Sequence, residues 1–273
     1  MKNTVCHLCK KEDSSLLMVV DKRPDCEINY NIPEDKYYRE LRECQFCGVI
    51  YNAHDTLIHS DFYTGFYNNA ITSDKLQKRF DKIISLPFSN SDNKNRVLRI
   101  INFLYSVDKN IHTLNVLDVG TGTGVFLNEM VKFGLSISCV DPDPHAIEHV
   151  SKNIQLKNTW TGKFSELKID ESFDLISFNK VLEHVENPVA EINKAFTLLN
   201  EEGLIYIELP DATPTMSAKN FTERTEFNLE HYTVYNEKSL SYLVGESGGE
   251  IINIESIHDP SGKHTIYCFI QKA

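Results

Sequence analysis

The sequence predicts an α/β fold, in which a doubly wound, mostly parallel sheet follows a small cysteine-bearing module. Three observations support this fold class. Residues 116–124 read Val-Leu-Asp-Val-Gly-Thr-Gly-Thr-Gly, the pattern of a strand that runs into a glycine turn. Strand and helix patterns alternate from there to the last residues. Four of the seven cysteines form two Cys-x-x-Cys pairs before residue 50.

The composition is that of a globular chain. Its 273 residues are 41% hydrophobic, which is enough to bury a full core. No stretch of 18 uncharged apolar residues occurs, and the first residues lack the apolar segment of a secretory signal. We therefore expect a cytoplasmic protein without a membrane span.

The charge balance disfavours nucleic acid as a partner. The net charge is -11, and no long basic run occurs. Because nucleic-acid binding depends on neutralising phosphates, an acidic chain would need a locally basic face, which only folding could create. A small-molecule substrate is therefore the favoured partner, and no pattern indicates the oligomeric state.

The two Cys-x-x-Cys pairs come first along the chain and predict a zinc ribbon. Four thiolates can close a tetrahedral shell around one zinc ion, and such a shell is structural. The 34-residue gap between the pairs is longer than the commonest ribbon spacing, so redox dithiols or unrelated buried cysteines remain alternatives. His7 and Cys26 are possible substitute ligands, whereas Cys139 and Cys268 suit the core. The predicted ligands are Cys6, Cys9, Cys44 and Cys47.

A linking segment follows, with the aromatic residues Phe62, Tyr63, Phe66 and Tyr67. The polar stretch Ser89 to Asn95 is expected to be a hinge or loop. Apolar residues then recur at helical spacing from Val97 to Leu104, which predicts the first helix against the sheet.

The sheet elements alternate with helices in the order that a doubly wound fold requires. The strand before the glycine turn is followed by a strand at Ser136 to Val140. The predicted elements after it are a helix at Pro144 to Asn153, the fourth strand at Phe173 to Phe178, a helix at Pro188 to Leu199, the fifth strand at Leu204 to Leu209, a helix at Asn236 to Glu246, and two final strands near Ile251 to Ile257 and Thr265 to Gln271.

The glycine turn carries an acid that limits its ligand. Asp118 precedes Gly120 by two positions, and a carboxylate there would repel a pyrophosphate and attract an ammonium or sulfonium. The dinucleotide pattern also fails, because Val125 stands where its third glycine would be. Asp141 closes the next strand about 20 residues on, where such folds place a ribose-binding carboxylate. Together these features suit S-adenosylmethionine.

These motifs resemble those of class I S-adenosylmethionine-dependent methyltransferases over about residues 95–272. The resemblance implies a Rossmann-like seven-stranded methyltransferase sheet with a small N-terminal zinc ribbon. It divides the chain into a zinc-binding ribbon (1–55), a linking or lid segment (56–95) and a methyltransferase domain (96–273). Relatives often fold a tyrosine-bearing segment over the cofactor, which makes Tyr63 and Tyr67 lid candidates. Packing between ribbon and core is the other explanation for them.

The resemblance assigns most of the expected cofactor contacts. Asp118, Gly120 and Gly122 would surround the methionine end, and Asp141 would bind the ribose. Lys163 replaces the acid that usually contacts adenine, which leaves the backbone of Phe164 and an apolar slot. Asn179 should join Gly120 and Asp141, because ligands of parallel sheets bind beyond the carboxyl ends of the strands. The predicted set is Asp118, Gly120, Gly122, Asp141, Pro142, Phe164 and Asn179.

The order of ribbon and sheet is similar to that of zinc-bearing methyltransferases acting on nucleotide-linked deoxysugars and other surface-glycan or antibiotic intermediates. In the sugar C-methyltransferases a Glu-His pair supplies the catalytic base, and Glu230 with His231 matches it. Their preceding tyrosine would fall at Asn228, and their further C-terminal domain is not expected after Ala273. The first departure puts carbon methylation in doubt, and the second weakens the substrate part of the resemblance. His184 is the alternative base.

The expected function is O-methylation of a small polar acceptor, namely a capsule or lipopolysaccharide precursor that is nucleotide-linked or phosphorylated. The fourth-strand segment Ser177 to Val185 lacks the Pro-Pro-Tyr motif of amino methyltransferases, and no Pro-Cys nucleophile occurs. Alternatives are C-methylation of a nucleotide-linked keto-deoxysugar, an RNA or protein methyltransferase that binds through the ribbon, and a non-catalytic cofactor-binding module.

Overall fold

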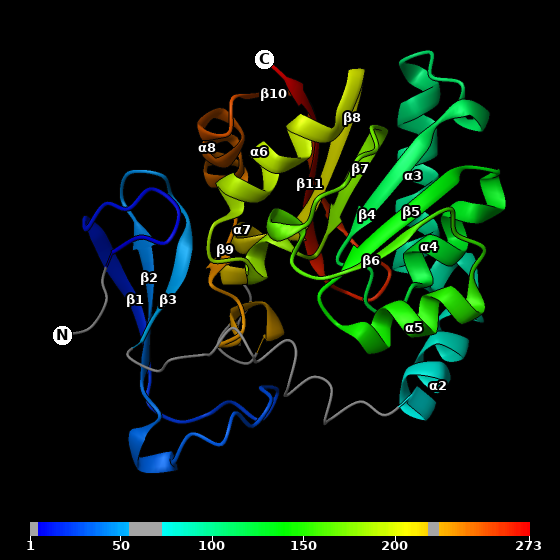
Figure 1. Cartoon of the computed structure of the whole chain (residues 1–273). Helices are drawn as coiled ribbons and strands as arrows, with labels where there is room; N and C mark the ends of the chain where they lie inside the picture. The colour runs from blue at the N-terminus through cyan, green and yellow to red at the C-terminus, as the bar shows by residue number, and fades with distance from the viewer. Residues whose placement is uncertain (1–4, 55–72, 218–223) are drawn as a thin grey trace.

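A computed structural model describes residues 5–54, 73–217 and 224–273 (Figure 1). Its larger sheet has seven strands in the order β10-β11-β8-β7-β4-β5-β6. The five strands from β8 to β6 are parallel to one another, and β11 and β10 run antiparallel to their neighbours. The strands are β4 (Asn115–Val119), β5 (Ser136–Asp141), β6 (Thr159–Thr161), β7 (Phe173–Asn179), β8 (Leu199–Pro210), β10 (Gly249–His258) and β11 (His264–Lys272). The predicted α/β fold with a seven-stranded sheet is confirmed.

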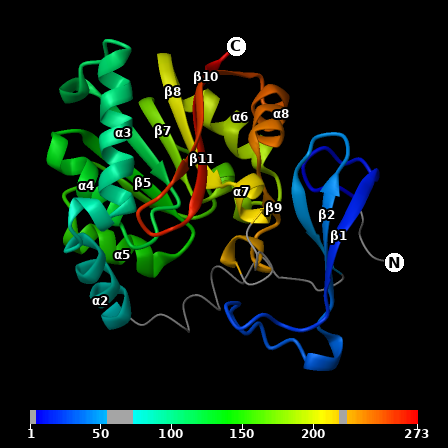
Figure 2. The ribbon, with the colours of Figure 1, turned by 180° about the vertical axis from the view of Figure 1, so that it is seen from behind.

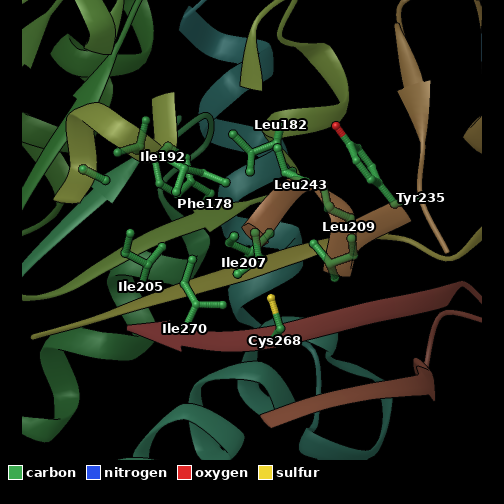
Figure 3. Packing of buried hydrophobic residues seen from close by; sticks show 14 of the residues in the cluster. Phe178, Leu182, Ile192, Ile205, Ile207, Leu209, Tyr235, Leu243, Cys268 and Ile270 are labelled. Atoms are coloured by element: carbon green, nitrogen blue, oxygen red, sulfur yellow. The ribbon is translucent and has the colours of Figure 1, made fainter. Parts of the chain in front are cut away.

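Helices cover both faces of this sheet because its strands alternate their side chains between two apolar layers. On β8, Ile205, Ile207 and Leu209 share one layer with Cys268 and Ile270 of β11 (Figure 3). Leu204 and Tyr206 of β8 belong to the opposite layer. The first layer is covered by α6 (Pro188–Leu198) and α8 (Glu237–Glu246), and the second by α3 (Asp92–Ser106), α4 (Val125–Met130) and α5 (Pro144–Asn153).

The polar stretch that was expected to be a hinge or loop is helical in its second half. The stretch Ser89 to Asn95 contains part of the short turn η3 (Phe88–Asn90) and the start of α3. The hydroxyl of Ser91 accepts a hydrogen bond from the backbone N–H of Lys94 at 3.3 Å, so this polar stretch supplies a helix cap. The helix α2 (Ser73–Ile84) precedes it and was not anticipated. The lid candidates Tyr63 and Tyr67 lie outside the described residues.

A second, four-stranded sheet has the order β1-β2-β3-β9, and the N-terminal module (residues 5–54) supplies three of its strands. Its first three strands are β1 (Ser14–Val20), β2 (Arg39–Cys44) and β3 (Ile50–Ala53). The fourth, β9 (Thr233–Val234), comes from the far end of the chain and pairs antiparallel with β3. Figure 2 shows this sheet beside β9 and α8. The module is therefore joined to the larger unit by backbone pairing as well as by packing.

The layer beneath α8 continues into the module. Cys6, Cys44 and Cys47 are buried in the same apolar cluster as Tyr235 and Leu240. Among the described residues, no helix is both long and apolar enough to cross a membrane.

Candidate functional site

The glycine turn after β4 is held open by backbone geometry and by Asp141. Gly120 and Gly122 have φ values of 77° and 50°, in the left-handed region that favours glycine. At Gly120 a Cβ atom would lie 2.5 Å from a side-chain carbon of Val181. The carboxylate of Asp141, at the end of β5, accepts the backbone N–H groups of Gly122 and Asp143, both at 2.8 Å. One acid therefore sets the shape of the turn.

A cavity of about 630 Å³ opens above this turn, at the carboxyl ends of β4, β5 and β7. This volume is within the range typical of small-molecule sites. The predicted residues that line it are Gly120, Gly122, Asp141, Pro142 and Phe164. The lining residues that were not predicted as cofactor contacts include Arg79, Lys163, Lys180, His184 and Tyr232.

Asp118 and Asn179 sit behind the cavity and are not among its lining residues. Asp118 is 2% exposed, and its carboxylate accepts a hydrogen bond from the hydroxyl of Ser177 at 2.6 Å. Burial raises the pKa of Asp118 to about 7 and that of Asp141 to about 6. The side-chain oxygen of Asn179 is buried and has no hydrogen-bond partner in the described part of the chain. This edge of the sheet therefore holds two acids and an unsatisfied acceptor.

The segment predicted to hold adenine carries an aromatic residue. Phe164 begins the short turn η6 (Phe164–Glu166), is buried and packs edge-on against Phe178 at 5.9 Å between ring centroids. Lys163 lies 3.7 Å from the carboxylate of Glu166. The cavity wall at this position is thus an aromatic face beside a mixed-charge rim.

Two histidines meet on the other side of the cavity. The ring of His184, at the end of η7 (Leu182–His184), lies 4.5 Å from that of His231 between centroids. His184 Nδ1 lies 3.1 Å from the carbonyl oxygen of Glu230, and His231 Nδ1 lies 2.7 Å from that of Glu226. Since a carbonyl oxygen only accepts, both rings carry a proton on Nδ1. His184 lines the cavity, whereas His231 is buried behind it.

The surroundings of His231 favour its neutral form. Burial and the nearby His184 ring lower the pKa of His231 well below its ordinary value. Glu183 is buried too, and its burial raises the pKa of its carboxyl group. One potential ligand atom from each of Glu183, His184 and His231 lies within 4.8 Å of the others. Sequence reasoning missed Glu183, although its place beside His184 in Leu-Glu-His-Val was a usable signal.

Glu230 was predicted to act with His231 through its side chain, but it contacts the histidine pair through its backbone. Its backbone carbonyl orients His184, while its carboxylate accepts a hydrogen bond from the hydroxyl of Tyr30 in the N-terminal module. The carboxylate is not among the groups that line the cavity.

A buried ionic network adjoins the cavity at Lys180. This lysine directly follows β7 with a left-handed φ of 59°, and its ammonium donates to the hydroxyl of Thr265 at 2.8 Å. It lies 3.7 Å from the carboxylate of Glu208, which is fully buried and also contacts Arg96 and Arg99. Burial disfavours the charged form of that carboxylate, but the neighbouring cations hold the pKa of Glu208 well below its usual range. No sequence pattern indicated this network.

The four paired cysteines come together. The distance from Cys6 Sγ to Cys47 Sγ is 3.6 Å and that from Cys9 Sγ to Cys44 Sγ is 3.4 Å. All four sulfur atoms lie within 4.8 Å of one another. The substitute ligands point elsewhere: His7 Nε2 lies 3.3 Å from the carbonyl oxygen of Asn52, and the Cys26 thiol lies 3.6 Å from the side-chain oxygen of Asn228.

Comparison with known proteins places this geometry among methyltransferases. A family model described as "Methyltransferase domain" matches residues 73–254. The mitochondrial ubiquinone biosynthesis O-methyltransferase of Schizosaccharomyces pombe is 32% identical over 80 residues, which are 27% of this chain and 29% of that protein. The ubiquinone biosynthesis O-methyltransferase of Haemophilus ducreyi is 23% identical over 123 residues, 41% of this chain and 52% of that protein. The chain thus spans about half or less of the length of these curated relatives.

Solved structures show the same fold at low sequence identity. Magnesium protoporphyrin IX methyltransferase from Synechocystis PCC 6803 with bound S-adenosylhomocysteine aligns with a TM-score of 0.58 and 14% identity, covering 81% of this chain and all of that one. An S-adenosylmethionine-dependent methyltransferase from Clostridium acetobutylicum aligns with a TM-score of 0.54 and 12% identity, covering 73% of this chain and 98% of that one.

Proposed function

This chain belongs to the family of methyltransferase domains, and from that premise we propose that it transfers a methyl group from S-adenosylmethionine to a small polar acceptor. The observation that carries this proposal is the glycine turn braced by Asp141 at the mouth of the 630 Å³ cavity. A glycine turn lets the backbone come close to a bound ligand, and the neighbouring carboxylates favour a cationic cofactor over a pyrophosphate.

The residues around the turn fit such a cofactor. Asp141 would bind the ribose, and Pro142 with Phe164 would enclose the adenine. Asp118 lies behind Gly120 and Gly122, where its charge would favour a cation. Asn179 lies behind the cavity wall and is given no contact with the cofactor in this proposal. The cofactor supplies a methyl group that its sulfonium already activates.

The protein's own chemical task is to orient the acceptor and to remove its proton. We assign the removal of this proton to the histidine pair, in which His184 lies on the cavity wall and His231 packs against it. Both rings carry their proton on Nδ1, so each offers a lone pair on Nε2, and a low pKa keeps His231 in the neutral form that can accept a proton. Glu230 acts through its backbone carbonyl, which holds His184.

For the acceptor we propose an oxygen atom of a surface-glycan precursor, nucleotide-linked or phosphorylated. Among the lining residues, Arg79 and Lys163 support a phosphate group on the acceptor, whereas Lys180 pairs with Glu208, and the acids Glu186 and Glu191 lie in the same lining. The names of the curated relatives support oxygen as the acceptor atom, and they make an intermediate of ubiquinone biosynthesis the second candidate. C-methylation would require exchange of a carbon-bound proton with solvent deuterium, and an RNA acceptor would require retention that weakens steeply with salt.

We also propose that the four paired cysteines hold a structural zinc ion. Zinc–sulfur bonds of about 2.3 Å imply sulfur–sulfur distances of about 3.8 Å in a tetrahedron. The observed distances of 3.4 and 3.6 Å are close to this value. A closed shell of four thiolates leaves no position for a substrate, so this ion would brace the module.

The test incubates the protein with methyl-labelled S-adenosylmethionine and a panel of nucleotide-linked sugars, phosphorylated glycan precursors, intermediates of ubiquinone biosynthesis and bulk RNA. Label on one small acceptor is expected, and mass spectrometric fragmentation would distinguish oxygen from carbon. His231→Ala and His184→Ala should each bind cofactor normally and lose about 10²-fold in turnover, since general base catalysis contributes about that much. The exposed His112 provides the control His112→Ala. Failure to bind S-adenosylmethionine would refute the enzyme proposal, and unchanged turnover would dismiss the histidine pair.

A further inference from the structure

The side chain of Asn52 joins the cysteine module to the segment that carries His231. Asn52 lies on β3 and is 2% exposed. Its amide nitrogen donates to the carbonyl oxygens of Asn228 at 3.1 Å and His231 at 2.9 Å. Its amide oxygen lies 2.6 Å from a guanidinium nitrogen of Arg39. Because a guanidinium can only donate, this contact fixes which end of the amide faces the two carbonyls.

Two further buried groups of the module hold the same segment. Arg39, also 2% exposed, donates to the carbonyl oxygen of Phe227 at 2.7 Å. Glu27 accepts the backbone N–H of Leu229 at 2.8 Å and pairs with Arg39 at 3.1 Å. Burying a charged group costs free energy unless its hydrogen-bond partners stay in place. Arg39 and Glu27 therefore favour the one path of residues 227–229 that satisfies them.

The backbone on either side of His231 is fixed as well. After it, Thr233 and Val234 pair with β3. Before it, the carbonyl of Glu226 accepts the Nδ1–H of the imidazole at 2.7 Å, which sets the tautomer. The rotation of the ring and the location of its proton therefore depend on the path of residues 226–231.

We propose that Asn52 is a positioning residue for His231, and that the N-terminal module is thereby part of the acceptor side of the active site. The proposal rests on the proposed function for its catalytic consequence, but the positioning itself is a property of the resting protein. Without the Asn52 amide, the carbonyls of Asn228 and His231 lose a shared buried donor. The segment then relaxes, and the hydrogen bond that sets the His231 tautomer loosens.

The test uses Asn52→Asp, which keeps the size of the side chain and replaces both N–H donors with an acceptor. Asn52→Ser is a second variant that adds no charge. Arg42→Met is the matched control, because Arg42 lies on β2 and its hydrogen bonds stay within the module. Its guanidinium donates to the carboxylate of Glu40 at 2.6 Å and to the hydroxyl of Ser14 at 3.0 Å. The control therefore weakens the module without removing a hydrogen bond to residues 226–231.

The readout is the histidine ring ¹⁵N NMR spectrum of the whole chain, with and without S-adenosylhomocysteine. The His231 signals are identified by their loss in His231→Gln. In the wild type they should report one Nδ1–H tautomer. In both Asn52 variants they should shift toward mixed tautomers, while S-adenosylhomocysteine binds within about twofold of wild type. With an accepted substrate, kcat should fall about 10-fold to 100-fold at nearly constant KM, as expected for a misplaced catalytic group.

Unchanged His231 signals in the two Asn52 variants would overturn the proposal. A change of equal size in Arg42→Met would also overturn it, because general weakening of the module would then explain the effect. Failure of the wild-type protein to bind S-adenosylhomocysteine would count against the proposed function instead, and the NMR comparison would still decide the positioning.

Discussion

Replacing Asp118 with asparagine should stabilise the cofactor-free protein in a pH-dependent way. Burial raises the pKa of this carboxyl group from an ordinary value of 3.8 to about 7. The folded protein therefore binds a proton more tightly than the unfolded chain does. Stability from this group is fully present below pH 3.8 and is lost as the pH rises through 7.

The size of the effect follows from that difference. About three pH units, at about 1.4 kcal/mol each, give a cost of about 4 kcal/mol once Asp118 is ionised. Between about pH 5 and pH 8 the cost in the wild type grows by about 2 to 3 kcal/mol. Asparagine does not ionise, and any cost of burying its amide is the same at both pH values. The advantage of Asp118→Asn over wild type should therefore grow by about 2 to 3 kcal/mol over this range.

The assay is urea unfolding of the cofactor-free protein at pH 5 and pH 8, with the exposed Asp170→Asn as the control. A cationic cofactor favours ionised Asp118, so wild-type affinity for S-adenosylmethionine should rise with pH through 7, and that of Asp118→Asn should change less. If wild type and Asp118→Asn lost stability equally between pH 5 and pH 8, the assignment of a buried, protonated Asp118 would be wrong.

Three other predictions concern the turn, the cysteines and the ionic network. Gly120→Ala should lower cofactor affinity at least about 10-fold in calorimetry, because its Cβ would meet a valine side chain at 2.5 Å; Gly122→Ala, with nothing within 4 Å, should have the smaller effect. Removing the metal with a chelator, or Cys44→Ser, should lower the melting temperature, and an unchanged melting curve would contradict the zinc proposal. Arg96→Met should cost about 3 to 5 kcal/mol in urea unfolding at neutral pH, since Glu208 would lose its best-placed cation, and should reduce the loss of stability on acidification, because the pKa of Glu208 would no longer be held so low; a loss below about 1 kcal/mol would show that the network is dispensable.

Local patterns were sufficient for most strands of the sheet and for the turn, but gave no bounds for the short β6. The runs of apolar residues predicted β7 closely and the buried half of β8, since strand side chains repeat every second residue and both faces are covered here. The glycines at 120 and 122 were predicted from their spacing, and their positive φ values explain why glycine is needed. The polar stretch Ser89 to Asn95 was predicted as a hinge or loop, but its second half begins α3, because capping residues and loop residues are the same types.

Sequence patterns did not predict the side-chain directions at the histidine site. His231 was chosen from its place in the chain, but side-chain direction put His184 on the cavity wall and turned the Glu230 carboxylate toward Tyr30. The depth of Asp118 behind the cavity was equally hidden, because burial depends on what packs around a residue rather than on its neighbours in sequence.

Local residue order thus determines most of the strands, the glycine turn and the two Cys-x-x-Cys spacings, because each depends on residues a few positions apart. Only the folded chain brings β9 against β3 and places Asn52 under the carbonyl of His231, 179 positions away. Hydrogen bonds across such separations leave no periodic signal, since the residues that make them are ordinary polar types. The physical reason is that buried polar groups must find partners wherever the fold provides them.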